Sequence, residues 1–299
     1  MRRALVCLLI ACGPGDPFGT AEPFQVRGGQ FFRGPLPTAT VAAPAVTFLS
    51  MQNAVVLPGQ AAKRLSARAN AMTSSLALAL SDSGTGYWVV PLGPEDPQYG
   101  GEFTVETSID FGLSLAEGAH VIRAVPIDEQ HRAGAEAQTG VCVASRIPDN
   151  QHVCNPKAVV PDAVISLQWD ARADVDLVVT TPDGREVSPK RPTVVPAGTR
   201  PDAEAAVIDR DSLFACQEDG LRQEDLVFQK RPTGAFRVAA SLFDLCQAPG
   251  VRFRLRVYEA EGEGPERHLT LKDSFAGQFM PIDANGGRTA PLFITTWAF

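Results

Sequence analysis

Acidic residues in the C-terminal half of the chain are spaced as a cation site would require. Asp174 and Asp176 are two residues apart in an apolar run, so on a strand both carboxylates leave the same face, opposite Val175 and Leu177. Two carboxylates held side by side repel each other unless a cation or hydrogen-bond donors join them. The spacing therefore predicts either a cation site or a solvated acidic face.

Calcium is the cation that we expect if any metal binds. Because Ca²⁺ takes roughly six to eight oxygen ligands, further acidic segments have to converge on the strand pair. An EF-hand that starts at Asp170 is excluded, since Val175 and Thr181 stand where its loop needs glycine and glutamate. The predicted ligands, from an acidic set that also holds Asp170 and Glu224, are Asp174, Asp176, Asp209, Asp211 and Asp225. The alternative is that these acids accept hydrogen bonds from loop amides and arginines.

Catalytic motifs are not evident in the sequence. The carboxylates could serve a glycosidase as acid and base, but the chain has only three Trp and three Tyr with which to line a sugar cleft. The nearest approach to a nucleophile elbow, Gly112 to Ala116, ends in alanine instead of glycine. The four histidines are scattered, and no phosphate-binding glycine loop is present. We therefore predict no catalytic residues.

Four cysteines outside the N-terminal segment, Cys142, Cys154, Cys216 and Cys246, predict disulfides. An even number in an exported chain is typical of disulfides, and four cysteines allow three connectivities. We expect Cys142–Cys154 and Cys216–Cys246, because each pair is close in sequence. A zinc site fits less well, since no two cysteines are spaced as C-x₂₋₄-C and no histidine has ligand spacing.

The N-terminus resembles that of a bacterial lipoprotein. Arg2 and Arg3 precede an apolar run over 4–11, and Leu9-Ile10-Ala11-Cys12 is similar to a lipobox. The resemblance implies a signal peptide over 1–11, lipidation of Cys12 and a place in the bacterial cell envelope; Gly13 resembles the residue found in lipoproteins passed to an outer membrane. An ordinary short secretory signal and a buried helix are the alternatives. The run is too short for a bilayer, which needs about 20 apolar residues.

Charge and hydropathy restrict the partners of the remaining chain. The formal net charge of the 299 residues is −7, which repels nucleic acids and anionic head groups. No later segment approaches the roughly 18 apolar residues of a membrane helix. We therefore expect no nucleic acid partner, and attachment to a membrane through the lipid alone.

Short apolar runs separated by turn residues predict an all-β chain of two antiparallel β-sandwich domains in tandem. Residues 251–258 alternate strictly, so Val251, Phe253, Leu255 and Val257 should face the core and Arg252, Arg254 and Arg256 should face water. The predicted segments are a flexible tether over 12–43, an Ig-like sandwich over 44–144, a linker over 145–162 and a second sandwich over 163–299.

Two stretches carry family resemblances. Residues 117–128, Glu-Gly-Ala-His-Val-Ile-Arg-Ala-Val-Pro-Ile-Asp, resemble the penultimate strand of bacterial Ig-like domains. Residues 169–184, from Trp-Asp to Pro-Asp-Gly, with Gly-Ala-Phe-Arg-Val at 234–238, resemble YfaP-like and pre-peptidase C-terminal domains over most of 163–299. An insertion around 189–201 departs from that pattern. The resemblance implies a secreted jelly-roll-like sandwich that accompanies other activities.

These observations favour a lipid-anchored protein of the cell envelope that presents a β-sandwich surface to a protein or glycan partner, without catalysis. The alternative is a calcium-dependent envelope hydrolase that uses the acidic cluster of the second domain. A hydrolase should group polar residues in a deep pocket, whereas a binding protein should present a flat or edge-strand surface.

Overall fold

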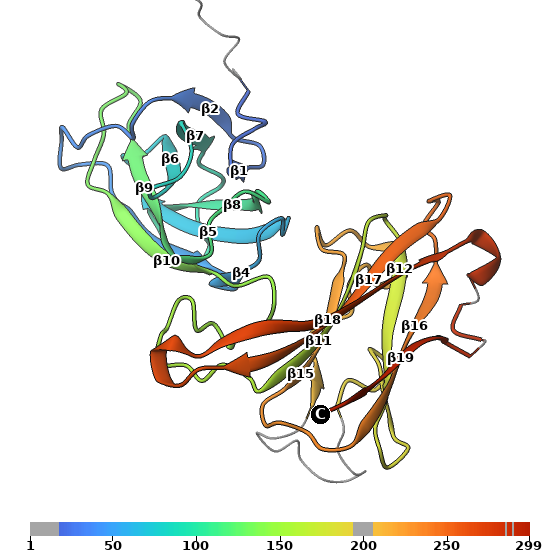
Figure 1. The fold of residues 1–299 in the computed structure, drawn as a ribbon. Coiled ribbons are helices and arrows are strands. Elements are labelled where there is room, and N and C mark those ends of the chain that lie inside the picture. Colours follow the sequence, from blue (N-terminus) through green and yellow to red (C-terminus); the bar gives the residue numbers. More distant parts are fainter. Residues whose placement is uncertain (1–17, 194–205, 285, 289) are drawn as a thin grey trace, which may run out of the picture. The chain divides into compact units, whose positions relative to one another are not determined.

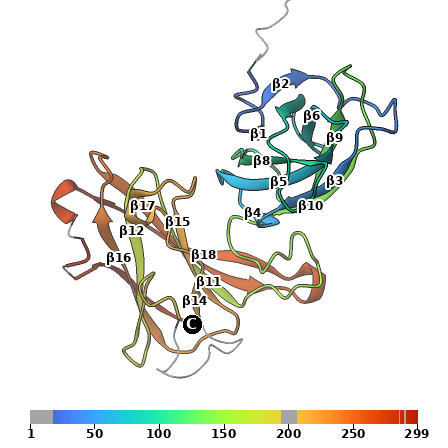
Figure 2. The same cartoon turned by 180° about the vertical axis from the view of Figure 1, so that it is seen from behind.

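The computed structural model describes residues 18–193, 206–284, 286–288 and 290–299, and the predicted all-β class is confirmed. The chain divides into two compact units, one of residues 18–52, 64–110 and 121–139 and the other of residues 53–63, 111–120 and 140–299. Figures 1 and 2 show its sheets from opposite sides. The described helices are single 3₁₀ turns, η1 (Phe214–Cys216), η2 (Gly264–Glu266) and η3 (Pro281–Asp283), and none is long and apolar enough to cross a membrane.

The earlier half of the chain forms a four-stranded sheet of order β1-β8-β5-β3 and a six-stranded sheet of order β2-β7-β6-β9-β10-β4. The last pair, β10 and β4, is parallel. The strands are β1 (Phe24–Val26), β2 (Gln30–Arg33), β3 (Val46–Met51), β4 (Val55–Val56), β5 (Lys63–Asn70), β6 (Ser75–Leu80), β7 (Gly86–Pro91), β8 (Glu102–Phe111), β9 (Gly118–Ile127) and β10 (Ala137–Val143).

Part of the predicted tether over 12–43 is instead folded, which corrects that prediction. Phe24, Val26 and Phe31 are buried in β1 and β2, and the indole of Trp88 donates a hydrogen bond to the Phe24 carbonyl (2.8 Å). Burial of these three side chains offsets the entropy that the glycines around them lose on ordering. The expected signal peptide and Cys12 lie outside the described residues.

The later half forms a five-stranded sheet of order β14-β15-β11-β17-β18 and a four-stranded sheet of order β13-β12-β16-β19. The strand pairings in these two sheets are antiparallel. The strands are β11 (Ala163–Trp169), β12 (Asp174–Thr180), β13 (Glu186–Val187), β14 (Val207–Ile208), β15 (Gln223–Phe228), β16 (Ala235–Asp244), β17 (Val251–Glu261), β18 (His268–Phe279) and β19 (Leu292–Ala298). Most of the predicted insertion lies outside the described residues.

One apolar core holds these two sheets together. Ile165 and Leu255 from the first sheet and Leu177 and Val238 from the second are all fully buried in it. The predicted orientation of residues 251–257 is confirmed, since the four apolar residues are buried while Arg252 and Arg254 are exposed and Arg256 is half-buried. Alternation on β17 therefore places one face in the core and one in water.

The start of β12 has an open backbone edge. On one side β12 pairs with β16 along its length, but on the other side β13 pairs only with Val179 and Thr180. The amides of Asp174 to Leu177 on this side therefore need partners from outside the sheet. Acidic side chains lie at this edge of the sheet.

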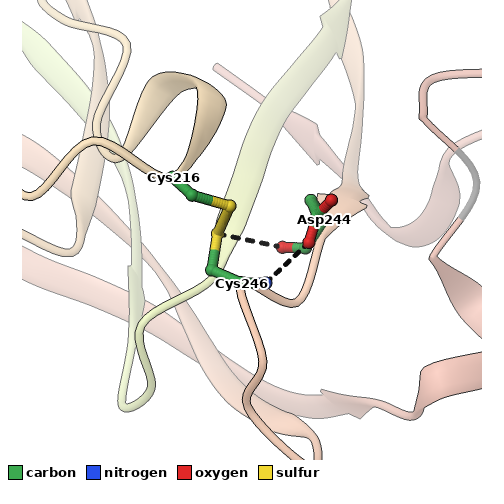
Figure 3. A group of neighbouring side chains, drawn as sticks. All are labelled: Cys216, Asp244 and Cys246. Atoms are coloured by element: carbon green, nitrogen blue, oxygen red, sulfur yellow. Dashed lines mark hydrogen bonds between the residues drawn. A yellow bond between two sulfur atoms is a disulfide. The ribbon is translucent and has the colours of Figure 1, made fainter.

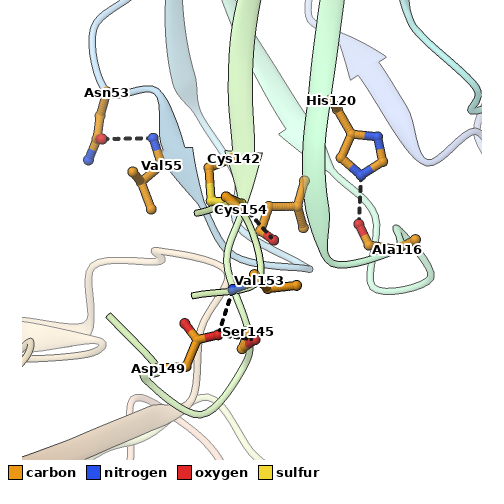
Figure 4. The surroundings of a disulfide bond; sticks show 10 residues. Asn53, Val55, Ala116, His120, Cys142, Ser145, Asp149, Val153 and Cys154 are labelled. Atoms are coloured by element: carbon orange, nitrogen blue, oxygen red, sulfur yellow. Dashed lines mark hydrogen bonds between the residues drawn. A yellow bond between two sulfur atoms is a disulfide. The ribbon is translucent and has the colours of Figure 1, made fainter. Parts of the chain in front are cut away.

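Both predicted disulfides are confirmed. Cys142 and Cys154, with Cα atoms 5.9 Å apart, join the end of β10 to the segment that follows it. In that segment Asp149 accepts hydrogen bonds from the Ser145 hydroxyl (2.9 Å) and the Val153 amide (3.0 Å) (Figure 4). Cys216 and Cys246, with Cα atoms 5.5 Å apart, join η1 to the turn after β16.

Candidate metal centre

Three carboxylates meet at the open edge of β12. Asp174 and Asp176 come from the strand and Asp211 from the loop between β14 and β15, and one oxygen of each lies within 4.8 Å of the others. Asp174 and Asp176 are buried, whereas Asp211 is exposed. The group therefore has a closed side within the protein and an open side at the loop, as a bound cation with some water ligands would require.

A fourth carboxylate, that of Glu224, lies near Asp176 and Asp211 but outside the group whose oxygens are within 4.8 Å of one another. Glu224 lies on β15, in register with Leu167, and its side chain is fully buried. Its Oε2 accepts a hydrogen bond from the Leu177 amide on the open edge (2.7 Å). Its Oε1 is also buried and makes no hydrogen bond of standard geometry among the described residues, although the Ser212 backbone is close enough to lower the pKa of the group. A buried carboxylate oxygen without a full partner is costly, so a proton or a cation on this atom would be favourable.

Burial raises the pKa values of all four acids, and repulsion from neighbouring carboxylates adds to the effect. Burial raises the pKa of Asp174 to about 7, and the charges of Asp176, Asp211 and Asp244 add to the effect. Burial and the Asp211 charge raise the pKa of Asp176 to about 6.

The same causes act on the other two carboxylates. Burial raises the pKa of Glu224 well above its usual value, aided by Asp176 and Asp211, and burial raises the pKa of Asp211. The Lys190 ammonium acts in the opposite direction on Asp176 and Asp211. A full set of charged carboxylates is therefore unfavourable here, and a divalent cation would remove that cost.

Asp209 and Asp225, which the sequence analysis placed among the ligands, form a separate group. Successive residues of a strand point to opposite faces, so Asp225 points away from the core that Glu224 faces. Its carboxylate accepts hydrogen bonds from the Gln223 amide nitrogen (2.7 and 3.0 Å). Asp209 accepts the Asp225 amide (3.0 Å) and pairs with Arg210. Asp170 is elsewhere too, because its carboxylate accepts the Arg252 amide (2.9 Å).

The Cys216–Cys246 disulfide lies beside Asp244 (Figure 3). Its sulfurs lie near Asp244 in what would otherwise be a metal-ligating group, but disulfide sulfurs are not thiolate ligands. The Asp244 carboxylate accepts the Cys246 amide (2.6 Å). Next to Cys216, the Ala215 amide donates to Asp174 (2.9 Å). The disulfide thus fixes a backbone donor on one of the candidate ligands.

No protein-family model matches the chain, and a search of curated proteins finds no match either.

Proposed function

We propose that Asp174, Asp176, Asp211 and Glu224 bind one calcium ion, and that this ion stabilises a non-catalytic β-sandwich protein of the cell envelope. The close approach of the Asp174, Asp176 and Asp211 carboxylates, with the buried Oε1 of Glu224 near Asp176, carries the proposal. A cation would give this oxygen a partner and offset the repulsion among the four carboxylates.

Calcium suits the site better than other common metals. All four ligands are carboxylates, which favours a hard cation over Zn²⁺ and its preference for nitrogen and sulfur. Ca²⁺ accepts irregular arrangements of roughly six to eight oxygens, whereas Mg²⁺ demands a near-ideal octahedron and is usually bound by only one or two carboxylates. Water at the open side, next to Asp211, would complete the coordination.

Burial favours a structural role for the ion over the alternative of a calcium-dependent hydrolase. Backbone amides hold Glu224 and Asp174, and Asp174, Asp176 and Glu224 are at most 8% exposed. A substrate would reach only Asp211. An acid and base pair for hydrolysis needs two groups that contact the substrate from opposite sides.

The proposed setting is the bacterial cell envelope, with the chain anchored to the outer membrane by lipid on Cys12. The lipobox-like residues 9–12 support this setting. Two disulfides support export as well, because such bonds persist in oxidising compartments. The Ig-like and YfaP-like resemblances fit a protein that presents sandwich surfaces to a protein or glycan partner.

Calcium should raise the thermal midpoint of the purified full chain. At a free concentration of about one hundred times Kd, the expected stabilisation is roughly 2.7 kcal/mol. Melting curves in calcium and in chelator, with calorimetric titration at pH 8, would measure it. The double change Asp174→Asn and Asp176→Asn and the single change Glu224→Gln should each abolish tight binding. Asp183→Asn, at an exposed turn acid, should leave binding unchanged. An unchanged midpoint in the parent chain would contradict the proposal.

Replacement of Cys12 tests the anchor separately. We expect Cys12→Ser to release the protein from the membrane fraction of the producing bacterium, because the lipid requires the thiol. A Cys7→Ser chain is the matched control and should stay with the membrane. Equal membrane partition of the parent and Cys12→Ser chains would exclude the lipid anchor and leave the calcium proposal standing.

A further inference from the structure

We propose that Arg252, Arg254 and Arg256 on β17 form a binding surface for an acidic glycan. The inference rests on the proposed role as an envelope binding protein and adds the chemical class of its partner. It concerns the outer face of the five-stranded sheet and requires none of the calcium ligands.

The three arginines stand in one row. They are separated by two residues each on a regular strand, so their side chains leave the same face about 6.8 Å apart. Arg252 and Arg254 are exposed, and Arg256 is half-buried with its Nη1 donating to the Gln168 side chain (2.6 Å). The row thus presents a line of positive charge along the strand.

The neighbouring strands do not neutralise this row. On β18 the partners of Arg252, Arg254 and Arg256 are Gln278, Ala276 and Ser274. On β11 the partners of the last two are Gln168 and Ser166. None of these side chains is acidic. Within the part of the chain that the structure describes, no ion pair joins the three guanidinium groups to a carboxylate.

Two acids lie near the row, and both are engaged. Asp170 lines its end, where its carboxylate accepts the Arg252 amide (2.9 Å). Asp225 is beside Ser166 on the same face but fully buried and held by Gln223. Burial and the Asp209 charge raise the pKa of Asp225, and the Arg210 guanidinium lies 4.0 Å from its carboxylate. In the described part of the chain, neither acid forms an ion pair with the three guanidinium groups, so the row keeps a net positive charge.

The row lines a shallow groove of about 340 Å³ that also touches Gln168, Trp169 and Ala276. Trp169 is at the end of β11 and packs with Ile165 and Leu167 in the apolar core, on the other face of the sheet. The polar side chains that the groove offers to a ligand are therefore those of the arginines, Gln168 and Asp170.

An acidic glycan fits these features better than other anionic polymers. Spaced carboxylate or sulfate groups would meet the arginines, and sugar hydroxyls would meet the neutral amides and hydroxyls of Gln168, Gln278 and Ser274. The net charge of −7 opposes every polyanion, and most strongly nucleic acid, because duplex DNA carries one negative charge per about 1.7 Å. Single-stranded nucleic acid also binds through exposed aromatic side chains. Electrostatic attachment to an anionic membrane takes clusters of about four to eight basic residues, whereas this row holds three.

Binding of two acidic probes to the full chain tests the inference. We expect an oligogalacturonate or a heparin octasaccharide to bind at low ionic strength in a calorimetric titration, and an uncharged malto-oligosaccharide of equal length not to bind. The double change Arg252→Gln and Arg254→Gln should weaken binding at least tenfold. The matched double change Arg191→Gln and Arg237→Gln, at arginines outside the row, should change binding less than twofold.

Several results would overturn the inference. These are failure of both acidic probes to bind, equal weakening by the two double variants, and equal binding of the neutral oligosaccharide. Binding of phosphatidylglycerol vesicles that depends on Arg252 and Arg254, without glycan binding, would assign the row to a lipid surface instead. Because the calcium titration and the membrane fractionation use other residues, a negative result here would leave both earlier proposals intact.

Discussion

Without calcium, the protein should be more stable at pH 5 than at pH 8. The folded-state pKa values of about 7 for Asp174 and about 6 for Asp176 lie above the value of about 3.9 expected in the unfolded chain. Between these values the folded state binds more protons than the unfolded state, so the free energy of unfolding falls as pH rises. Each extra bound proton contributes a slope of about 1.4 kcal/mol per pH unit.

Calcium should restore the stability that the protein loses between pH 5 and pH 8. A cation binds the deprotonated carboxylates and displaces their protons, so its stabilising effect should be large at pH 8 and small at pH 5. Urea unfolding at both pH values, with calcium and with chelator, would measure this linkage. The chain with Asp174→Asn and Asp176→Asn is the control. It should retain the slopes due to other groups, such as His152 and Asp225, whose pKa values are also raised.

The comparison of stabilities should not extend below about pH 4, because other acids act there with the opposite sign. Asp128, Asp183 and Glu261 have lowered pKa values because of their hydrogen bonds with Arg132, Thr181 and Lys272. Their contribution to stability is lost as pH falls below about 4, which is opposite in sign to the effect of the buried acids. A chelated parent chain whose slope between pH 5 and 8 equals that of the double variant would exclude a role for Asp174 and Asp176.

Two-residue periodicity predicted only the local part of the candidate centre. It placed Asp174 and Asp176 on one face of a strand, which the structure confirms. The same periodicity could have indicated that Glu224 faces the core, because Leu226 and Phe228 alternate with it and are buried in the core. The choice between Asp209 and Asp211 could not be predicted, since both precede β15 in a loop whose path depends on tertiary packing.

Closeness in sequence predicted the disulfides correctly, whereas local alternation was too brief to predict the first strands. The paired cysteines are 12 and 30 residues apart, and such short loops close easily in the unfolded chain. By contrast, β1 and β2 are short and surrounded by glycines and prolines. Their alternation over Phe24, Val26 and Phe31 is too brief to be recognised without the partner strands β8 and β7.

Loss of the Cys216–Cys246 disulfide should destabilise the protein and weaken its calcium binding together. For a separation of 30 residues, the entropic model gives a loss of about 3.5 kcal/mol. We expect the double change Cys216→Ser and Cys246→Ser to cost this amount in urea unfolding. The bond also fixes Ala215, whose amide donates to Asp174, so a mobile η1 would leave this ligand poorly oriented. Calcium affinity should therefore fall at least tenfold.

The other disulfide is the matched control for this effect. The double change Cys142→Ser and Cys154→Ser opens a loop of 12 residues, for which the same model gives a loss of about 3 kcal/mol. Neither cysteine is next to a candidate ligand, so calcium affinity should stay within twofold of the parent value. Titration of both variants under conditions where each is folded separates positioning of Asp174 from general destabilisation. Equal calcium affinities of the two double variants would show that the Cys216–Cys246 disulfide does not orient Asp174.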